Sequence, residues 1–138
     1  MSGTYEMPVE KGKIREFARA VKSGSDAHAG DSPLMPPTML TTARLVWQPQ
    51  GLNPLAGLSL DMARVLHGEE EYEFFGPLPK AGDVLHVSTR LGDQYEKEGK
   101  RGGTMRFIVV LNEFRTAGGE LVAVQRTTIV ETARTTGS

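Results

Sequence analysis

Cysteine is absent from this 138-residue sequence, which excludes disulfide bonds, thiol catalysis and thiolate metal sites. Charge of one sign is not in excess either, because 16 basic and 17 acidic residues leave a formal net charge of -1. The charge therefore does not predict a nucleic-acid-binding protein. Long apolar runs are missing as well: the longest, at residues 107–111, is far too short to cross a bilayer.

The N-terminal residues contain no basic stretch followed by an apolar segment, so we do not predict a signal peptide. Together with the missing cysteine, this favours a cytoplasmic protein. The length fits one domain, and 38% hydrophobic with 24% charged residues is an ordinary balance for a folded chain. We therefore predict one domain over residues 1–138, with residues 1–4 and 133–138 flexible.

Near the N-terminus, apolar residues recur at the spacing i, i+3, i+4 and i+7, namely Ile14, Phe17, Ala18 and Val21. The residues between them are mostly charged. This pattern predicts an amphipathic helix that ends near residues 23–24 and covers a core with its apolar face.

A second helix is predicted after an irregular segment. Residues 24–37 hold three prolines and two glycines, which excludes a regular element there. Pro37 suits the first turn of a helix, and residues 39–46 are apolar over most of the circumference. We therefore expect this helix to be buried. Residues 47–60, rich in proline and glycine, predict a long surface loop, and residues 60–66 a short helical turn.

From Glu69 onward the hydrophobic period changes from helical to alternating. Alternation predicts strands over residues 69–74, 85–91, 104–116 and 120–132. The Ala-Gly-Gly sequence before the last of them predicts a hairpin. Helices followed by antiparallel strands indicate the α+β class, in which one face of the sheet is buried against a helix. We expect a curved antiparallel sheet that wraps around the buried helix, which is then the central helix of the domain.

Several motifs follow one another in an order typical of one family. Residues 5–21 resemble the opening of N-terminal MaoC-like dehydratase domains, and PPTM at residues 36–39 resembles the start of their central helix. LHGEEEYEF at residues 66–74, PLPKAGDVL at residues 77–85 and the final hairpin at residues 118–123 resemble later family motifs. The resemblance covers nearly the whole chain and depends on the order and spacing of the motifs together.

The resemblance implies the hot-dog fold and the activity of a hydro-lyase of lipid metabolism. It implies an (R)-specific enoyl-thioester hydratase or 3-hydroxyacyl-thioester dehydratase, with an acyl-CoA or acyl-carrier thioester as substrate and no further cofactor. It also implies a homo- or hetero-oligomer with another hot-dog subunit, whose sheets join edge to edge. Commonly only one hot dog of such a pair carries the catalytic residues. An open sheet edge independently favours oligomerisation.

The loop after the first helix departs from the catalytic pattern of the family, Asp-x-Asn-Pro-x-His. One group must deprotonate the attacking water and another must exchange a proton with the substrate. Here the loop holds Asp26, His28 and Asp31 but no asparagine, and the residue five positions after Asp31 is Pro36. Two interpretations remain open: Asp26 and His28 form a displaced catalytic pair, or these are solvated loop residues that satisfy turn N–H groups.

The other two histidines are weaker candidates. His67 lies at a helix-to-strand junction, where we expect a structural hydrogen bond. His86 lies on the polar side of its predicted strand, where we expect it at the surface. No pair of histidines has metal-ligand spacing, so we predict no metal site.

The start of the central helix is a candidate substrate site. Backbone N–H groups near Pro37 and Thr38 would stabilise a thioester oxygen that becomes enolate-like. Met35, Met39 and Trp47 can line an acyl channel, although each is also an ordinary core residue.

A basic, glycine-rich segment at residues 97–103 includes Lys100 and Arg101. These two side chains can meet the phosphates of coenzyme A or of a carrier-protein arm. The alternative is a solvated hairpin tip. The glycines do not form a P-loop, which needs a lysine and a hydroxyl at fixed places.

Four functions are therefore considered. The first is the substrate-channel half of a heteromeric hydratase or dehydratase, with the catalytic pair in a partner. The second is a self-sufficient homodimeric enoyl-CoA hydratase that uses Asp26 and His28. The third is a non-enzymatic acyl-binding module. The fourth is a hot-dog thioesterase, for which Asp61 is the nearest carboxylate but is poorly placed for attack. Fold alone does not separate them.

Overall fold

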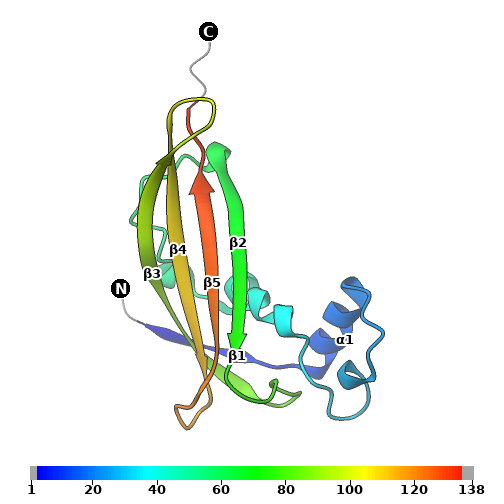
Figure 1. Cartoon of the computed structure of the whole chain (residues 1–138). Coiled ribbons are helices and arrows are strands. Elements are labelled where there is room, and N and C mark those ends of the chain that lie inside the picture. Colours follow the sequence, from blue (N-terminus) through cyan, green and yellow to red (C-terminus); the bar gives the residue numbers. More distant parts are fainter. Residues whose placement is uncertain (1–2, 135–138) are drawn as a thin grey trace.

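In the computed structural model, which describes residues 3–134, five strands form one curved antiparallel sheet (Figure 1). Their order across the sheet is β1-β3-β4-β5-β2. Short helical turns lie behind the sheet in this view, and α1 (Lys11–Ala20) lies beyond its lower right. The strands are β1 (Thr4–Pro8), β2 (Val65–Phe74), β3 (Val84–Glu98), β4 (Thr104–Arg115) and β5 (Leu121–Glu131). This arrangement is the predicted α+β class.

Alternation along the strands gives the sheet an inner face and an outer face. On β4 the inward residues Ile108, Val110, Asn112 and Phe114 are buried, whereas the outward residues that alternate with them are partly exposed. Phe114 lies opposite Val87 on β3 and Ala123 on β5, and all three belong to the main core. The inner face therefore packs against the helical segment, as the period of two predicts.

α1 forms where the apolar spacing predicts it. Ile14 and Ala18 are buried, and Phe17 packs against the main core. Val21 lies just after the last helical residue and is 51% exposed, so it does not extend the buried stripe as predicted.

The central helix is not the continuous buried helix that the sequence predicts. The segment forms a 3₁₀ turn, η2 (Pro37–Thr41), followed by a single π-type turn, η3 (Ala43–Trp47). The hydroxyl of Thr42 donates to the carbonyl of Met39 over 2.8 Å. In an α-helix that carbonyl would accept from the backbone N–H four residues on, so the side chain competes with helix continuation.

Burial along this segment is correspondingly uneven. Met39, Leu40 and Ala43 are fully buried on the inner face of the sheet, whereas Leu45 and Val46 are 68% and 52% exposed. The prediction of burial is wrong for these last two residues. The short turns press only one side against the sheet, and an apolar circumference cannot all be covered by one surface.

Three strands differ from the sequence prediction. β2 begins at Val65, four residues before the predicted start at residue 69. β1 was not expected, because only Tyr5 and Met7 point inward along its five residues. β3 continues to Glu98, past its predicted end at residue 91 and into the basic segment of residues 97–103. The extension is stabilised on the outer face, where the rings of Tyr95 and Phe107 stack at 4.9 Å and Lys97 lies over both. Alternation alone did not reveal pairing between such polar residues.

The chain ends bear on the predicted flexible segments. Thr4 is the first residue of β1 and pairs with Ser88. Residues 1–2 and 135–138 lie outside the described residues, so their flexibility stays a prediction.

Candidate functional site

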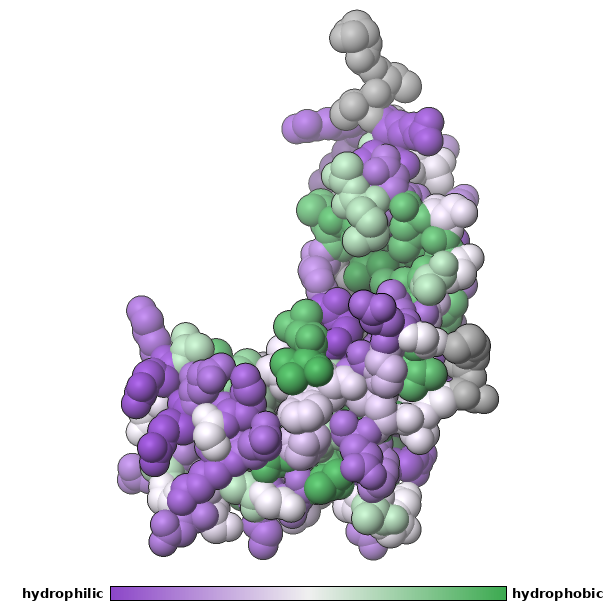
Figure 2. Space-filling view, turned by 180° about the vertical axis from the view of Figure 1, so that it is seen from behind, coloured by the Kyte–Doolittle hydropathy of each residue, from purple (hydrophilic) through white to green (hydrophobic). Residues whose placement is uncertain are grey.

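A cavity of about 110 Å³ lies between the inner face of the sheet and the segment of residues 44–62. We call it the sheet cavity. Its lining residues are Arg44, Gln48, Asn53, Pro54, Leu55, Leu60, Met62, Val65, His67, Val110, Asn112, Thr127 and Ile129. From behind, hydrophobic side chains gather over the upper part of the sheet, above the helical body (Figure 2). The lining is mainly apolar and includes one histidine and one arginine but no carboxylate.

A row of polar side chains crosses the inner face at the edge of this cavity. Thr89, Asn112, Gln125 and Tyr72 lie opposite one another on β3, β4, β5 and β2. The first three are buried. The amide of Asn112 donates from Nδ2 to Gln125 Oε1 over 3.1 Å. Polar residues at inward positions of apolar strands cost free energy unless they are hydrogen-bonded, so this row requires an explanation.

Glu70 on β2 fixes the direction of the hydrogen bonds in the row. Its carboxylate accepts from Gln125 Nε2 and, over 3.0 Å, from the hydroxyl of Thr127. Because an ionised carboxylate only accepts, Gln125 must present its NH₂ group to Glu70 and its oxygen to Asn112. Asn112 then donates to Gln125, and its Oδ1 has no hydrogen-bond partner among the described residues. The row therefore leaves one buried acceptor without a donor, in a residue that lines the cavity, and an unpaired buried acceptor costs free energy.

Two tyrosines near the row keep their protons. Burial raises the pKa of Tyr5 to about 12, against a smaller opposing effect of the Arg44 guanidinium. Burial and, secondarily, the neighbouring Glu70 carboxylate raise the pKa of Tyr72. Both phenols are therefore neutral hydroxyl groups at physiological pH and do not serve as bases.

Asp26 and His28 lie apart from the sheet cavity. Both belong to the 3₁₀ turn η1 (Asp26–His28), whose start is capped by the hydroxyl of Ser25. They line a surface pocket against α1, and no residue of that pocket lines the sheet cavity. His28 Nδ1 is bonded to the carbonyl of Leu34 over 2.7 Å, and Asp26 is exposed. No hydrogen bond joins Asp26 to His28 in the described chain, and their catalytic role stays a prediction.

Asp31, the spare acid of that interpretation, is exposed and lies 3.6 Å from the Lys11 ammonium. Asp61 is also exposed. It caps the short 3₁₀ turn η5 (Met62–Arg64), and its hydrogen bond from Arg64 lowers the pKa of the carboxyl. Both carboxylates are therefore used in local turn and ion-pair contacts.

The predicted substrate residues are spread over the molecule. Met35 and Met39 are fully buried in the main core, and Trp47 packs against it. Pro37 and Thr38 are exposed at the start of η2.

Lys100 and Arg101 are exposed at the hairpin between β3 and β4, at the far end of the sheet from α1 (Figure 1). The structure therefore does not bring the basic hairpin and the start of η2 together. A role of these residues in substrate binding stays a prediction.

His67 was expected to form a structural hydrogen bond, and none is present in the described chain. It lines the sheet cavity instead, beside a β-bulge between His67 and Glu69. His86 lies on the outer face of β3 and is half-buried. Sequence reasoning missed Arg44, Asn112 and Thr127 in the cavity. Asn112 and Gln125 were detectable, because each is a polar residue where alternation demands an apolar one.

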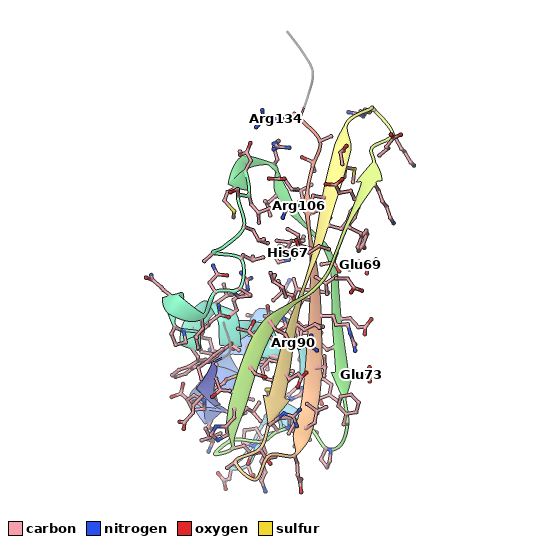
Figure 3. The ribbon with its side chains drawn as sticks, turned by 90° about the vertical axis from the view of Figure 1, so that its left-hand side faces the viewer. His67, Glu69, Glu73, Arg90, Arg106 and Arg134 are labelled. Atoms are coloured by element: carbon pink, nitrogen blue, oxygen red, sulfur yellow. The ribbon has the colours of Figure 1, made fainter. Side chains whose placement is uncertain are left out.

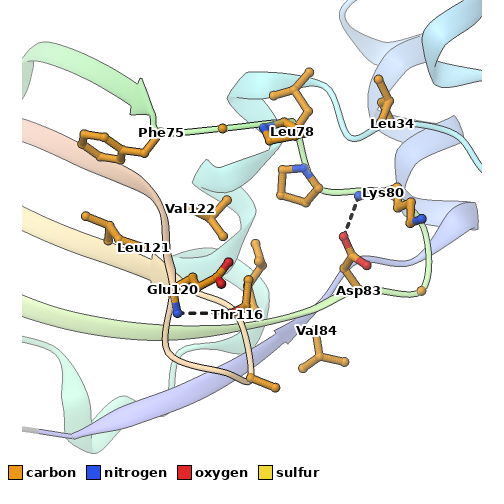
Figure 4. Close-up of a pocket in the computed structure, with 16 residues that line it drawn as sticks. Leu34, Phe75, Leu78, Lys80, Asp83, Val84, Thr116, Glu120, Leu121 and Val122 are labelled. Carbon is orange, nitrogen blue, oxygen red and sulfur yellow. Dashed lines mark hydrogen bonds between the residues drawn. The ribbon is translucent and has the colours of Figure 1, made fainter.

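A larger groove of about 720 Å³ lies at the lower end of the sheet (Figure 4). It is framed by the segment after β2 and by the hairpin between β4 and β5. Two of its polar side chains are engaged locally: Asp83 accepts from the backbone of Lys80 at 3.0 Å, and Thr116 accepts from that of Glu120 at 3.2 Å. The groove therefore presents apolar surface around Phe75 and Val84 rather than an acid–base pair.

Two further observations concern residues 3–134. No three His, Asp or Glu side chains gather as metal ligands would. No helix in this part is both long and apolar enough to cross a membrane.

The family of the FAS1-like dehydratase domain region matches residues 1–125. The chain belongs to this family. A relative from Saccharopolyspora erythraea, named "UPF0336 protein", is 33% identical over 141 residues, which cover 91% of this chain and 81% of the relative.

Solved structures agree with this assignment. The chain is similar to the C-terminally truncated HadBC (3R-hydroxyacyl-ACP dehydratase) complex from Mycobacterium tuberculosis, with a TM-score of 0.73, 25% identity and 94% coverage of each chain. It is also similar to a MaoC-like dehydratase, with a TM-score of 0.76 and 24% identity over 96% of this chain and 41% of the other. The predicted hot-dog fold and the resemblance to MaoC-like dehydratases are confirmed.

Proposed function

We propose that this chain is the substrate-channel subunit of a heteromeric (R)-specific enoyl-thioester hydratase or 3-hydroxyacyl-thioester dehydratase. It supplies part of the wall of the acyl channel, and a second hot-dog subunit supplies the catalytic acid and base. The enzyme is a hydro-lyase of lipid metabolism in the cytoplasm. The substrate is an acyl-CoA or acyl-carrier thioester, and no further cofactor is required.

The observation that carries this proposal is the composition of the sheet cavity. Hydration of an enoyl thioester needs a group that deprotonates water and a group that exchanges a proton with the substrate. The cavity is lined by His67 and Arg44 but by no carboxylate, and Asp26 and His28 line a separate surface pocket. An apolar wall without an acid–base pair suits the half of an enzyme that holds the acyl chain.

The chemistry of the polar row supports the same assignment. The free Oδ1 of Asn112 is held in place by Gln125 and, beyond it, by Glu70. A 3-hydroxyacyl group carries a hydroxyl donor, and a pantetheine arm carries amide donors, so either would satisfy this buried acceptor once neighbouring side chains move to expose it. The name of the similar HadBC complex, a 3R-hydroxyacyl-ACP dehydratase, supports a thioester substrate and a partner subunit.

The test is a hydration assay on the purified chain alone, with a short and a long trans-2-enoyl-CoA, followed by loss of the conjugated absorbance. We expect no turnover. Activity should appear when the chain is combined with a hot-dog subunit that carries the Asp-x-Asn-Pro-x-His segment. Release of free coenzyme A is followed in parallel with a thiol reagent, which gives no protein background because the chain has no cysteine.

Each other result identifies a different function. Hydration by the chain alone, lost in Asp26→Asn and His28→Ala, would establish a self-sufficient hydratase. Release of free coenzyme A would establish a thioesterase. Binding of the enoyl-CoA without turnover, whether or not the catalytic subunit is present, would establish an acyl-binding module.

A further inference from the structure

β2 ends the sheet, so one row of its backbone N–H and C=O groups faces no other strand in the described chain. The strand has ten residues, whereas β1 at the opposite edge has five. Leu66 on β2 and Phe75 just beyond it are 60% and 50% exposed. A long open edge with exposed apolar residues at both ends is a surface that pairs with another strand.

The outer side of this edge carries a row of acids. Glu69, Glu71 and Glu73 lie opposite Thr128, Arg126 and Val124 of β5, on the outer face. In Figure 3, Glu69 and Glu73 point away from the helical side of the sheet, whereas His67 lies on the other side. We call these three side chains the outer carboxylate row.

One cation neutralises part of this row. The guanidinium of Arg126 lies 2.7 Å from Glu71 and 3.6 Å from Glu73. Glu69 forms no ion pair within residues 3–134. One guanidinium is therefore shared by two of the three carboxylates, and the open edge stays acidic.

Pairing with a second copy of this chain would place acid against acid. In an antiparallel pair, opposing residues point to the same face, so the outward positions of one strand always meet outward positions of the other. When Glu71 lies opposite Glu71 of the second copy, Glu69 of each copy lies opposite Glu73 of the other. Shifting the register by two residues keeps carboxylates opposed. Like charges directly opposite one another destabilise a strand pair.

We propose that the outer carboxylate row on β2 prevents this open edge from pairing with a second copy of the chain, and that it selects a different hot-dog subunit. The partner's edge strand presents lysine or arginine at alternate outward positions. This inference rests on the proposed function, in which the chain is one half of a two-subunit enzyme. It adds the charge that selects the partner.

The test uses a charge-reversed copy of the chain as the probe for a basic edge. In E69K/E71K/E73K, every outward position of the row becomes a lysine. We expect the wild type and this variant each to be monomeric by sedimentation velocity, and their equimolar mixture to form a 1:1 dimer. The dimer should dissociate more readily, by about tenfold in Kd, when the salt is raised from about 0.1 M to about 1 M. Hydrogen exchange should slow at the β2 amides only in the mixture.

Two further variants make the result specific. E16K/E98K/E120K changes the net charge equally at three exposed positions away from β2, so its mixture with the wild type should stay monomeric. E69Q/E71Q/E73Q removes the repulsion without adding cations, so this variant alone should dimerise through β2. A melting curve for each variant shows that it is folded.

The proposal is overturned if the wild type alone forms a dimer that protects β2. It is also overturned if the folded lysine variant does not dimerise with the wild type and the glutamine variant stays monomeric. The proposed function fails independently of this test, because hydratase activity of the isolated chain would refute it without changing the mixing experiment.

Discussion

Asn112 on β4 donates its side-chain amide to Gln125 on β5 over 3.1 Å, and both residues are buried on the inner face of the sheet. The pair is anchored by Glu70 at the open edge, which accepts from Gln125. A carboxylate at the edge thereby sets the orientation of an amide two strands away. Because Gln125 presents its oxygen to Asn112, Asn112 must donate its amide to Gln125. Its Oδ1 is therefore left without a donor.

The first prediction concerns the coupling between these two residues. Asn112→Leu leaves the oxygen of Gln125 without its donor, so the free energy of unfolding should fall by about 1–3 kcal/mol. Gln125→Leu should cost a similar amount. The double variant should cost less than the sum by about 1 kcal/mol, because the broken hydrogen bond is counted once. Denaturant unfolding of the three variants measures this, and strict additivity would contradict a direct interaction.

The second prediction concerns Tyr5 and alkaline pH. Because the folded-state pKa of about 12 lies above the unfolded value of about 10, the folded chain holds this proton more tightly. The resulting stabilisation is complete below pH of about 10 and is lost as the pH rises from about 10 to about 12. Tyr5→Phe should make this decline shallower. At neutral pH it should keep or raise stability, because the buried Tyr5 hydroxyl has no partner in the described chain and an unpaired buried hydroxyl costs free energy.

Denaturant unfolding at a series of pH values, beside an ultraviolet titration of the phenols, checks this prediction. A wild-type and a Tyr5→Phe protein that lose stability equally above pH of about 10 would show that Tyr5 is not responsible.

The third prediction separates a structural from a catalytic His28. The ring nitrogen Nδ1 holds the Leu34 carbonyl, so His28→Ala should lower the free energy of unfolding by about 1 kcal/mol. His28→Asn places an amide donor near the position of Nδ1 and should restore most of that loss. In the complete enzyme, both variants should keep kcat within about twofold once folded. A large loss of kcat in His28→Asn with unchanged stability would favour a catalytic histidine.

The fourth prediction tests the sheet cavity as part of the acyl channel. Val110 points into the cavity, whereas its neighbour Val109 points to the outer face. Val110→Phe should fill much of the 110 Å³ cavity and lower kcat/KM for long enoyl chains about tenfold or more relative to short ones. Val109→Phe adds the same volume on the outer face and should leave the preference unchanged. If the two variants changed the chain-length preference equally, the sheet cavity would not be part of the acyl channel.

The sequence determined much of the fold, because alternation and helical spacing are local properties. The spacing of Ile14 and Ala18 was enough to place α1, and alternation was enough to place the strands on either side of the Gly118 hairpin. Local patterns did not predict the segments that are strands only because a neighbouring strand stabilises them. β1 carries only two inward apolar residues, and the end of β3 is held by the stacking of Tyr95 on Phe107 of another strand.

The candidate site depended on tertiary structure for a physical reason. The sheet cavity joins Arg44 of the helical turns to His67, Asn112 and Thr127 of three strands, and no local spacing connects these residues. The sequence did identify the loop of Asp26 and His28 as altered from the catalytic pattern. Only the folded chain placed that loop away from the cavity, against α1.

The sequence by itself therefore determined the fold class, the family resemblance and the order of the last four strands along the chain, since each follows from periodicity and motif order. The tertiary structure decided which strand remains open at the edge and which inward polar groups meet. Strand order and cross-strand register bring distant residues together, so Glu70, Gln125 and Asn112 became one hydrogen-bonded row only when β2, β5 and β4 were aligned. The same alignment left the carboxylates of β2 facing outward, where a partner strand has to meet them.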